Sequence, residues 1–282
     1  MMFPVRIEVI PSQGIVGQVQ ALVPRTTTLS VTCLPHHGIE RTLRTAVELG
    51  DAGYTVVPHL AARSISSTAE LTGIVRACGA AGISEVFVIG GDRKQPAGVY
   101  RSALPVLEDI AQYTGGTMRA GVAGYPEGHP AVSPVDLLDG LLAKQHLAAH
   151  VVTQMCFSTE KIRDYAAFLR GEGVHLPVWA GVAGAVPRTK LVALGTQIGV
   201  GSSLKFLSRK GPLARKLLSG DRYSPDSLIA SLESQPGSIA GIHLYSFNSL
   251  QSVPGNQLPA EPEQATTAAL QTALIRGAAR DS

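Results

Sequence analysis

A glutamate interrupts the first of several short apolar runs in this sequence. Glu8 lies between Ile7 and Val9, in the middle of the run at 5–11. Burying an unpaired carboxylate is costly, so a glutamate in this position needs either a charged partner or a chemical role. Because a carboxyl group held in an apolar setting suits proton donation, we interpret Glu8 as a candidate general acid. Pairing with a buried arginine is the structural alternative.

Two further polar side chains lie at or near the ends of later runs. Asp92 follows Gly90 and Gly91 in the segment VIGGD, where glycines let the backbone come close to a ligand. Gln154 lies in the run VVTQMCF, where an inward amide can both donate and accept hydrogen bonds. We therefore treat both as candidate binding residues. The structural alternatives are a turn cap for Asp92 and a core amide for Gln154.

Histidines near the ends of the apolar runs keep a metal site open as an alternative. These residues are His36, His37, His59, His129 and His243. Imidazole is a common zinc ligand, but zinc ligands are usually closely spaced along the chain. The first run has no His-x-His pair, which weighs against a metal-dependent barrel hydrolase built on these histidines and Asp92.

The segments that must position these groups alternate regularly between two kinds. Runs rich in Val and Ile predict eight strands, over residues 5–11, 28–35, 55–61, 85–91, 119–126, 150–157, 177–183 and 239–247. Segments of helical period separate them, such as 67–82, which offers a Ser or Thr cap and a closing glycine, and 159–173, with Phe168 in its apolar stripe. Eight strand–helix units predict a closed (β/α)8 TIM barrel, whose active site forms at the C-terminal strand ends.

The whole chain, residues 1–282, is predicted to form one barrel domain, because no low-complexity linker divides it. The longest interval between strands, 184–238, predicts two or three extra helices between the seventh and eighth strands. The segment 260–280 predicts the last barrel helix.

Composition restricts the classes of partner and compartment. The net charge is only +3, which gives no reason to expect a nucleic acid. A basic cluster at 205–216 predicts a solvated helix face or a docking surface for an anionic substrate tail. Three cysteines without CxxC spacing indicate a reducing compartment. Because we find neither a signal-peptide pattern nor a membrane-length apolar run, we expect a cytoplasmic protein that does not bind membranes.

Six segments, taken together and in order, resemble the methylenetetrahydrofolate reductase family. The first strand carries its glutamate in IEVIP, and the fourth ends in a Gly-Asp pair. GVAGYPEGHP at 121–130 is similar to the family's YPExHP signature, and VVTQMCF is similar to its T-Q-F-F-F strand. PHLA at 58–61 and HLYSFN at 243–248 resemble segments of strands three and eight. The resemblance covers nearly the whole barrel.

The resemblance implies reduction of 5,10-methylenetetrahydrofolate to 5-methyltetrahydrofolate. Glu8 would be the general acid that helps to open the five-membered ring, and a hydride would reduce the resulting iminium to a methyl group. Asp92 would accept hydrogen bonds from the pterin, and Gln154 and Tyr125 would also contact the small folate substrate. The implied cofactor contacts are His59, Asp136 and His129.

Several positions that would meet a flavin depart from the family pattern. The family's Arg-Gly-Asp after strand four begins here with Gly90. Asp136 matches in the fifth helix, but the lysine seven positions on is replaced by Ala143. Fixed cations normally offset a pyrophosphate's charge, so these losses weigh against the family's FAD. They favour direct hydride transfer from NAD(P)H, with NADH preferred. The family's arginine after the last strand is Ser249 here, so the basic cluster is a candidate site for the glutamate tail.

Other classes of function remain as alternatives. A deazaflavin-dependent reductase of a related tetrahydropterin would share the barrel and Glu8, and a metal-dependent hydrolase would use the histidines. GVGSS at 199–203 weakly suggests a phosphosugar enzyme. A Schiff-base aldolase is disfavoured because no lysine lies in any predicted strand. The presence of Glu8 also weighs against a non-catalytic folate-binding protein.

Overall fold

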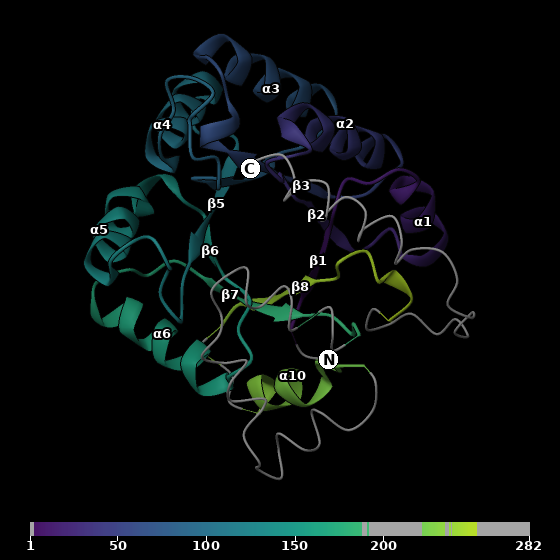
Figure 1. The fold of residues 1–282 in the computed structure, drawn as a ribbon, viewed down its shortest axis with the longest axis vertical. Helices are drawn as coiled ribbons and strands as arrows, with labels where there is room; N and C mark the ends of the chain where they lie inside the picture. The colour runs from purple at the N-terminus through teal and green to yellow at the C-terminus, as the bar shows by residue number, and fades with distance from the viewer. Residues whose placement is uncertain (1–2, 188–190, 192–221, 235–236, 238, 253–282) are drawn as a thin grey trace, which may run out of the picture.

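Eight parallel strands close into a barrel in the order of the sequence (Figure 1). The computed structural model describes residues 3–187, 191, 222–234, 237 and 239–252. The strands are β1 (Val5–Val9), β2 (Thr28–Val31), β3 (Val56–Ala61), β4 (Glu85–Ile89), β5 (Arg119–Gly124), β6 (His150–Thr153), β7 (Val178–Ala183) and β8 (Gly241–Tyr245). β1 pairs with both β2 and β8, so the ring has no free edge. The predicted TIM barrel and all eight strands are confirmed, although several strands end earlier than predicted because the chain turns into the following loop.

The helices form an outer ring around the barrel (Figure 1). They are α1 (Ile15–Leu22), α2 (Gly38–Asp51), α3 (Thr68–Ala80), α4 (Ala103–Thr114), α5 (Pro134–Lys144), α6 (Thr159–Gly171) and α10 (Asp226–Glu233), with short 3-10 turns η1 (Ala62–Ser64), η2 (Gln145–Leu147) and η3 (Leu250–Ser252). Of the predicted Ser or Thr caps of α3, the structure has serine: the Ser67 side chain accepts a hydrogen bond from the Glu70 N–H. The expected position of Phe168 in the buried stripe of α6 is wrong: its side chain is 47% exposed.

Some predictions fall on parts of the chain outside the described residues. α10 is the helix described within 184–238, and the other helices predicted for that interval lie largely outside the description. The basic cluster at 205–216, the GVGSS turn at 199–203 and the helix predicted at 260–280 also lie outside it. In the part that is described, no helix is both long and apolar enough to cross a membrane.

Alternate residues of each strand face opposite sides of the barrel wall. Outward side chains such as Ile7 and Leu29 belong to the main core under the helices. Inside the barrel, Val57, Phe87 and Val152 form a separate buried apolar cluster. The three cysteines are buried with free thiols, as expected of small apolar fillers.

A charged cluster fills the barrel at the N-terminal ends of the strands. Arg6 forms an ion pair with Glu85, and its guanidinium lies 4.1 Å from the centre of the Trp179 ring. Arg6 Nη1 is also 3.1 Å from His150 Nε2. A Cβ on Gly121 would lie 2.4 Å from that same imidazole nitrogen, so only glycine leaves room for His150. Because this end is packed, a ligand must enter from the opposite end.

Candidate active site

The Glu8 carboxylate lies inside the barrel, between two histidines. The alternation of β1 turns Ile7 and Val9 outward and Glu8 inward, where its side chain is 11% exposed. Its Oε2 atom is 3.1 Å from His243 Nε2 and 3.7 Å from His59 Nε2. The inward position predicted for Glu8 is confirmed. Its neighbours are imidazoles on β8 and β3 rather than the buried arginine of the structural alternative.

His59 is held by Ser30 and lies close to Glu8. Ser30 Oγ is 2.7 Å from His59 Nε2 and also donates to the carbonyl oxygen of Val57. Burial lowers the pKa of His59 to about 4; the negative charge of Glu8 opposes this shift and His243 adds to it. His59 is therefore neutral at pH 7. Although the resemblance assigns His59 to the cofactor, its described polar contacts are to the candidate acid and to Ser30.

Tyr245 spans the space beside this cluster because a glycine makes room for it. Its hydroxyl donates to the Thr153 carbonyl oxygen at 2.9 Å, which links β8 to β6 across β7. A Cβ on Gly181 would lie 2.2 Å from that oxygen and 2.9 Å from the Tyr245 ring. Burial, and then the charge of Glu8, raises the pKa of Tyr245 well above 10, so its hydroxyl stays protonated and remains a donor.

The three predicted substrate residues lie at the C-terminal ends of neighbouring strands. Asp92 is exposed after β4, Tyr125 is half-buried directly after β5, and Gln154 directly follows β6 rather than lying within it. Burial and the negative charge of Asp92 raise the pKa of Tyr125, which places these two residues in one electrostatic neighbourhood. Gln154 Oε1 accepts the Met155 N–H at 2.8 Å, so its amide donors are the groups it can offer to a ligand. Their roles in binding stay predictions.

The loop that carries Asp92 is anchored to η1. Gly91 has a φ of 85°, and a Cβ there would lie 3.0 Å from Cβ of Ala61. Glycine is therefore required both by the backbone conformation and by the close approach to β3. The Arg63 backbone N–H donates to the Gly90 carbonyl oxygen at 3.0 Å, and its side chain donates to the carbonyl oxygens of Arg93 and Lys94. No sequence pattern pointed to this role for Arg63.

Two of the five histidines near strand ends join a carboxylate. Ligand atoms of Glu8, His59 and His243 all lie within 4.8 Å of one another, so these three residues could hold a metal ion. His36 and His37 instead contact each other, with ring centroids 4.2 Å apart, after β2. The sequence suggested a metal site in which Asp92 supplies the carboxylate. In the structure, the carboxylate beside the histidines is Glu8 instead.

Comparison with known proteins identifies the family. The methylenetetrahydrofolate reductase family profile matches residues 23–193, which is more than half of the chain. The chain belongs to the methylenetetrahydrofolate reductase family. The matched range includes Asp92 and Gln154, whereas Glu8 and His243 lie outside it. A crystal structure of oxaloacetate acetylhydrolase matches with a TM-score of 0.55 and 10% identity, over 99% of this chain and 83% of that chain. At such low identity this match shows the fold alone.

In this methylenetetrahydrofolate reductase family member, the predicted cofactor residues His129 and Asp136 lie in the loop and helix after β5. His129 Nδ1 accepts the Ala131 N–H at 3.1 Å. Asp136 is exposed in the first turn of α5, and its carboxylate accepts a hydrogen bond from the Ser133 hydroxyl at 2.7 Å. Ser133 Oγ in turn accepts the Asp136 N–H at 3.2 Å and so caps the helix. Two helical turns on, the same face carries exposed Ala143. Lys144 lies about 100° further around the helix, and burial lowers its pKa. The cofactor roles of His129 and Asp136 stay predictions.

An arginine reaches Ser249 from a distant part of the chain. Arg222 Nη2 donates to Ser249 Oγ at 3.0 Å and to the Ala185 carbonyl oxygen at 2.9 Å. A guanidinium therefore lies just after β8, where Ser249 itself supplies none. Arg222 was not predicted as a site residue, because no spacing along the chain connects it with this position.

Ser30 and Tyr245 also lie in the site without having been predicted from the sequence. Both lie at inward positions in register with Glu8 on the two strands that flank β1. The alternation of residues along each strand predicts which positions face the barrel interior. The pairing between strands is also needed to identify which of these inward residues lie beside Glu8.

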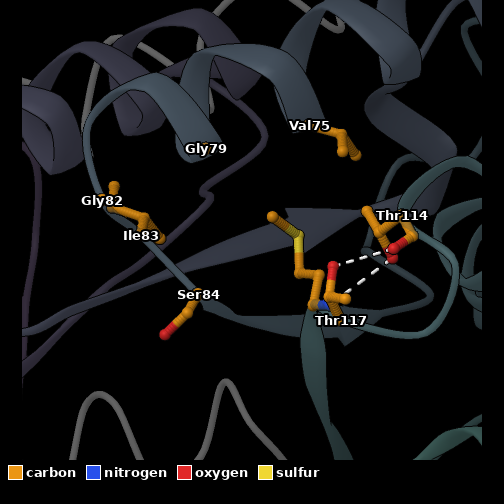
Figure 2. A pocket seen from close by; sticks show the side chains of 8 residues that line it. Val75, Gly79, Gly82, Ile83, Ser84, Thr114 and Thr117 are labelled. Carbon is orange, nitrogen blue, oxygen red and sulfur yellow. Dashed lines mark hydrogen bonds between the residues drawn. The ribbon is translucent and has the colours of Figure 1, made fainter.

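A hollow of about 350 Å³ lies at the other end of the barrel, before β4 and β5. Its walls come from α3, α4 and the turns that follow them (Figure 2). It is lined by Val75, Gly79, Gly82, Ile83, Ser84, Thr114, Thr117 and Met118. Because no lining side chain titrates near neutral pH, this hollow offers no acid–base chemistry.

Proposed function

We propose that this protein reduces 5,10-methylenetetrahydrofolate to 5-methyltetrahydrofolate, with a hydride that NAD(P)H, preferably NADH, gives directly to the folate. The observation that carries the proposal is the Glu8 carboxyl group inside the barrel, whose Oε2 atom faces two histidine nitrogens rather than a basic ion-pair partner. Such a group can exchange a proton with a substrate. Membership of the methylenetetrahydrofolate reductase family supports the class of reaction.

Glu8 would act in the first of two chemical steps. It donates its proton to the nitrogen on the aminobenzoate side of the five-membered ring as the bond from that nitrogen to the methylene carbon breaks. The lone pair of the pterin nitrogen forms the iminium. The hydride then adds to the methylene carbon, which gives the methyl group and NAD(P)⁺, and Glu8 recovers its proton from solvent. General acid catalysis of this kind contributes about 10²–10⁴-fold.

Asp92, Tyr125 and Gln154 would orient the pterin against Glu8. The Asp92 carboxylate is exposed after β4 and can accept hydrogen bonds from the pterin amino and ring N–H groups, which are strengthened by its charge. The raised pKa of Tyr125 keeps its hydroxyl protonated and therefore a donor at neutral pH. Gln154 would offer its amide donors to the pterin carbonyl oxygen.

The described residues do not fit FAD, the cofactor that the family implies, at the positions where the family holds it. A Cβ on Gly90 would meet nothing within 4 Å, so the place of the family's arginine is open space. Ala143 carries no charge on the helix face that Asp136 begins. The two cations that would offset a pyrophosphate are thus missing, and the proposed steps use no flavin.

Following NADH absorbance tests this function directly. Purified protein is mixed with NADH and methylenetetrahydrofolate without added flavin, after its own visible spectrum is recorded. We expect a colourless protein that consumes NADH and forms 5-methyltetrahydrofolate. Consumption only after FAD is added would restore a flavin-dependent reaction. If neither NADH nor NADPH reacts under any condition, the reductase proposal is wrong, and a reduced deazaflavin donor is the next to be tested.

A metal-dependent hydrolase is the second candidate, favoured by the cluster of Glu8, His59 and His243. Metal-bound histidines normally donate their other ring N–H to a second group, which fixes the ring. Among the described residues, the buried Nδ1 of His243 has no such partner. The reductase therefore accounts better for this cluster. Metal analysis of the purified protein, and NADH consumption after treatment with a chelator, distinguish the two candidates.

A further inference from the structure

The two oxygens of the Glu8 carboxyl group have different surroundings. Oε2 faces the Nε2 atoms of His243 and His59, at 3.1 and 3.7 Å. Oε1 has no hydrogen-bond partner among the described residues, and the side chain retains 11% exposure. We propose that His243 is a positioning residue that presents an N–H group to Oε2, so that the transferable proton of Glu8 resides on Oε1. The inference rests on the proposed role of Glu8 as the general acid.

The hydrogen bonding of His243 determines which of its nitrogens carries the proton. Its Nδ1 atom is buried without a partner in the described part of the chain. A buried N–H without an acceptor is rarer and costlier than an unsatisfied acceptor, so Nδ1 is the unprotonated nitrogen. The proton then lies on Nε2, which donates to Glu8 Oε2.

Ser30 determines the proton position on His59 by the same reasoning. The Ser30 hydroxyl donates to the Val57 carbonyl oxygen, so its own oxygen is left to accept from His59 Nε2 at 2.7 Å. The opposite arrangement would turn the lone pair of Nε2 toward the carboxylate. Because burial keeps His59 neutral, its single Nε2–H is donated to Ser30, and at 3.7 Å from Glu8 Oε2 it makes no hydrogen bond with the carboxylate.

A nitrogen that donates its N–H to Oε2 cannot accept a proton from that oxygen, so the proton of Glu8 is placed on Oε1. Oε2 accepts hydrogen bonds in both states of Glu8, whereas Oε1 gains and loses the proton. The acid is thereby oriented before substrate binds. Of the two possible proton positions on the carboxyl group, the unproductive one on Oε2 is avoided. The described titratable groups that face Glu8 are His59, His243 and Tyr245, with Arg6 two residues before it on the same strand.

The test compares His243→Leu, which removes the donor, with His243→Gln, which restores an N–H donor. His175→Gln is the matched control, because His175 is exposed before β7 and far from the mouth. Loss of the N–H bond destabilises ionised Glu8, so the acid stays protonated to higher pH. We expect the falling limb of the kcat profile to move up by roughly one to two pH units in His243→Leu. kcat should fall at least about tenfold with an unchanged KM, and His243→Gln should recover most of both effects.

Nitrogen-15 NMR of the imidazoles in the wild-type protein gives a readout independent of turnover. We expect the signal that disappears in His243→Gln to be that of an Nε2–H imidazole. An Nδ1–H imidazole, or an unchanged pH profile in an active His243→Leu variant, would overturn the inference. If the wild type itself does not consume NADH, the proposed function fails while the NMR result still decides the proton position. If His243→Leu does not fold, His243→Gln and the wild-type spectrum decide it.

Discussion

Replacing Glu8 by glutamine separates its chemistry from its place in the fold. Glutamine has nearly the same shape as glutamate, and its carbonyl oxygen can still accept the N–H of His243. In the wild type, His243 Nε2 lies 3.1 Å from Glu8 Oε2. The free energy of unfolding should therefore change by no more than about 1 kcal/mol. The proton, however, is lost. We expect kcat to fall about 10²–10⁴-fold, which corresponds to roughly 3–5 kcal/mol of barrier.

Glu85 provides the matched control, since its side chain is also 11% exposed inside the barrel but lies at the other end. Glu85→Gln leaves Arg6 buried without its ionised partner. Breaking a buried pair costs about 3–5 kcal/mol, or roughly 5–15 °C in Tm for a chain of this size. Its effect on kcat should be much smaller than that of Glu8→Gln.

The assay follows NADH absorbance and thermal unfolding for both variants and the wild type. The expected pattern is an inactive but stable Glu8→Gln and an active but less stable Glu85→Gln. Loss of less than about tenfold in kcat for Glu8→Gln would refute the acid role. So would a fall in Tm as large as that of the Glu85 variant, because the loss of activity would then reflect folding.

Two further predictions concern the flavin and the pH dependence of stability. Gly90→Arg should fold normally, because a Cβ at position 90 meets nothing within 4 Å. The variant should bind FAD about 10–100-fold more tightly than the wild type in a fluorescence titration. Unchanged affinity would contradict the inference that the missing arginine weakens FAD binding. Burial lowers the pKa of His59 to about 4 and that of His150 to about 3. Unfolded histidines protonate near pH ~6.5, so stability should be complete above that pH and should fall toward pH 4. Urea unfolding across this range measures the loss, and equal midpoints would argue against neutral buried imidazoles.

Much of the fold follows from local sequence patterns. Apolar runs of strand length, separated by helices with serine caps such as Ser67, predict parallel strand–helix units, and eight such units favour closure. The predicted ends of the strands were less accurate. The run containing Gln154 continues beyond β6, because apolar residues such as Met155 remain buried after the chain has left the sheet.

The sequence by itself determined that Glu8 is an inward carboxylate near the barrel mouth, because strand alternation assigns its face and the apolar neighbours assign its burial. It also located Asp92 after the fourth apolar run and Gln154 within the sixth, although Gln154 in fact directly follows β6. Only the tertiary structure decided that His243 and His59 flank Glu8. Closing the barrel brings β8 beside β1, across more than two hundred residues of chain. No local sequence pattern encodes this contact, because it depends on the register of two strands at opposite ends of the sequence.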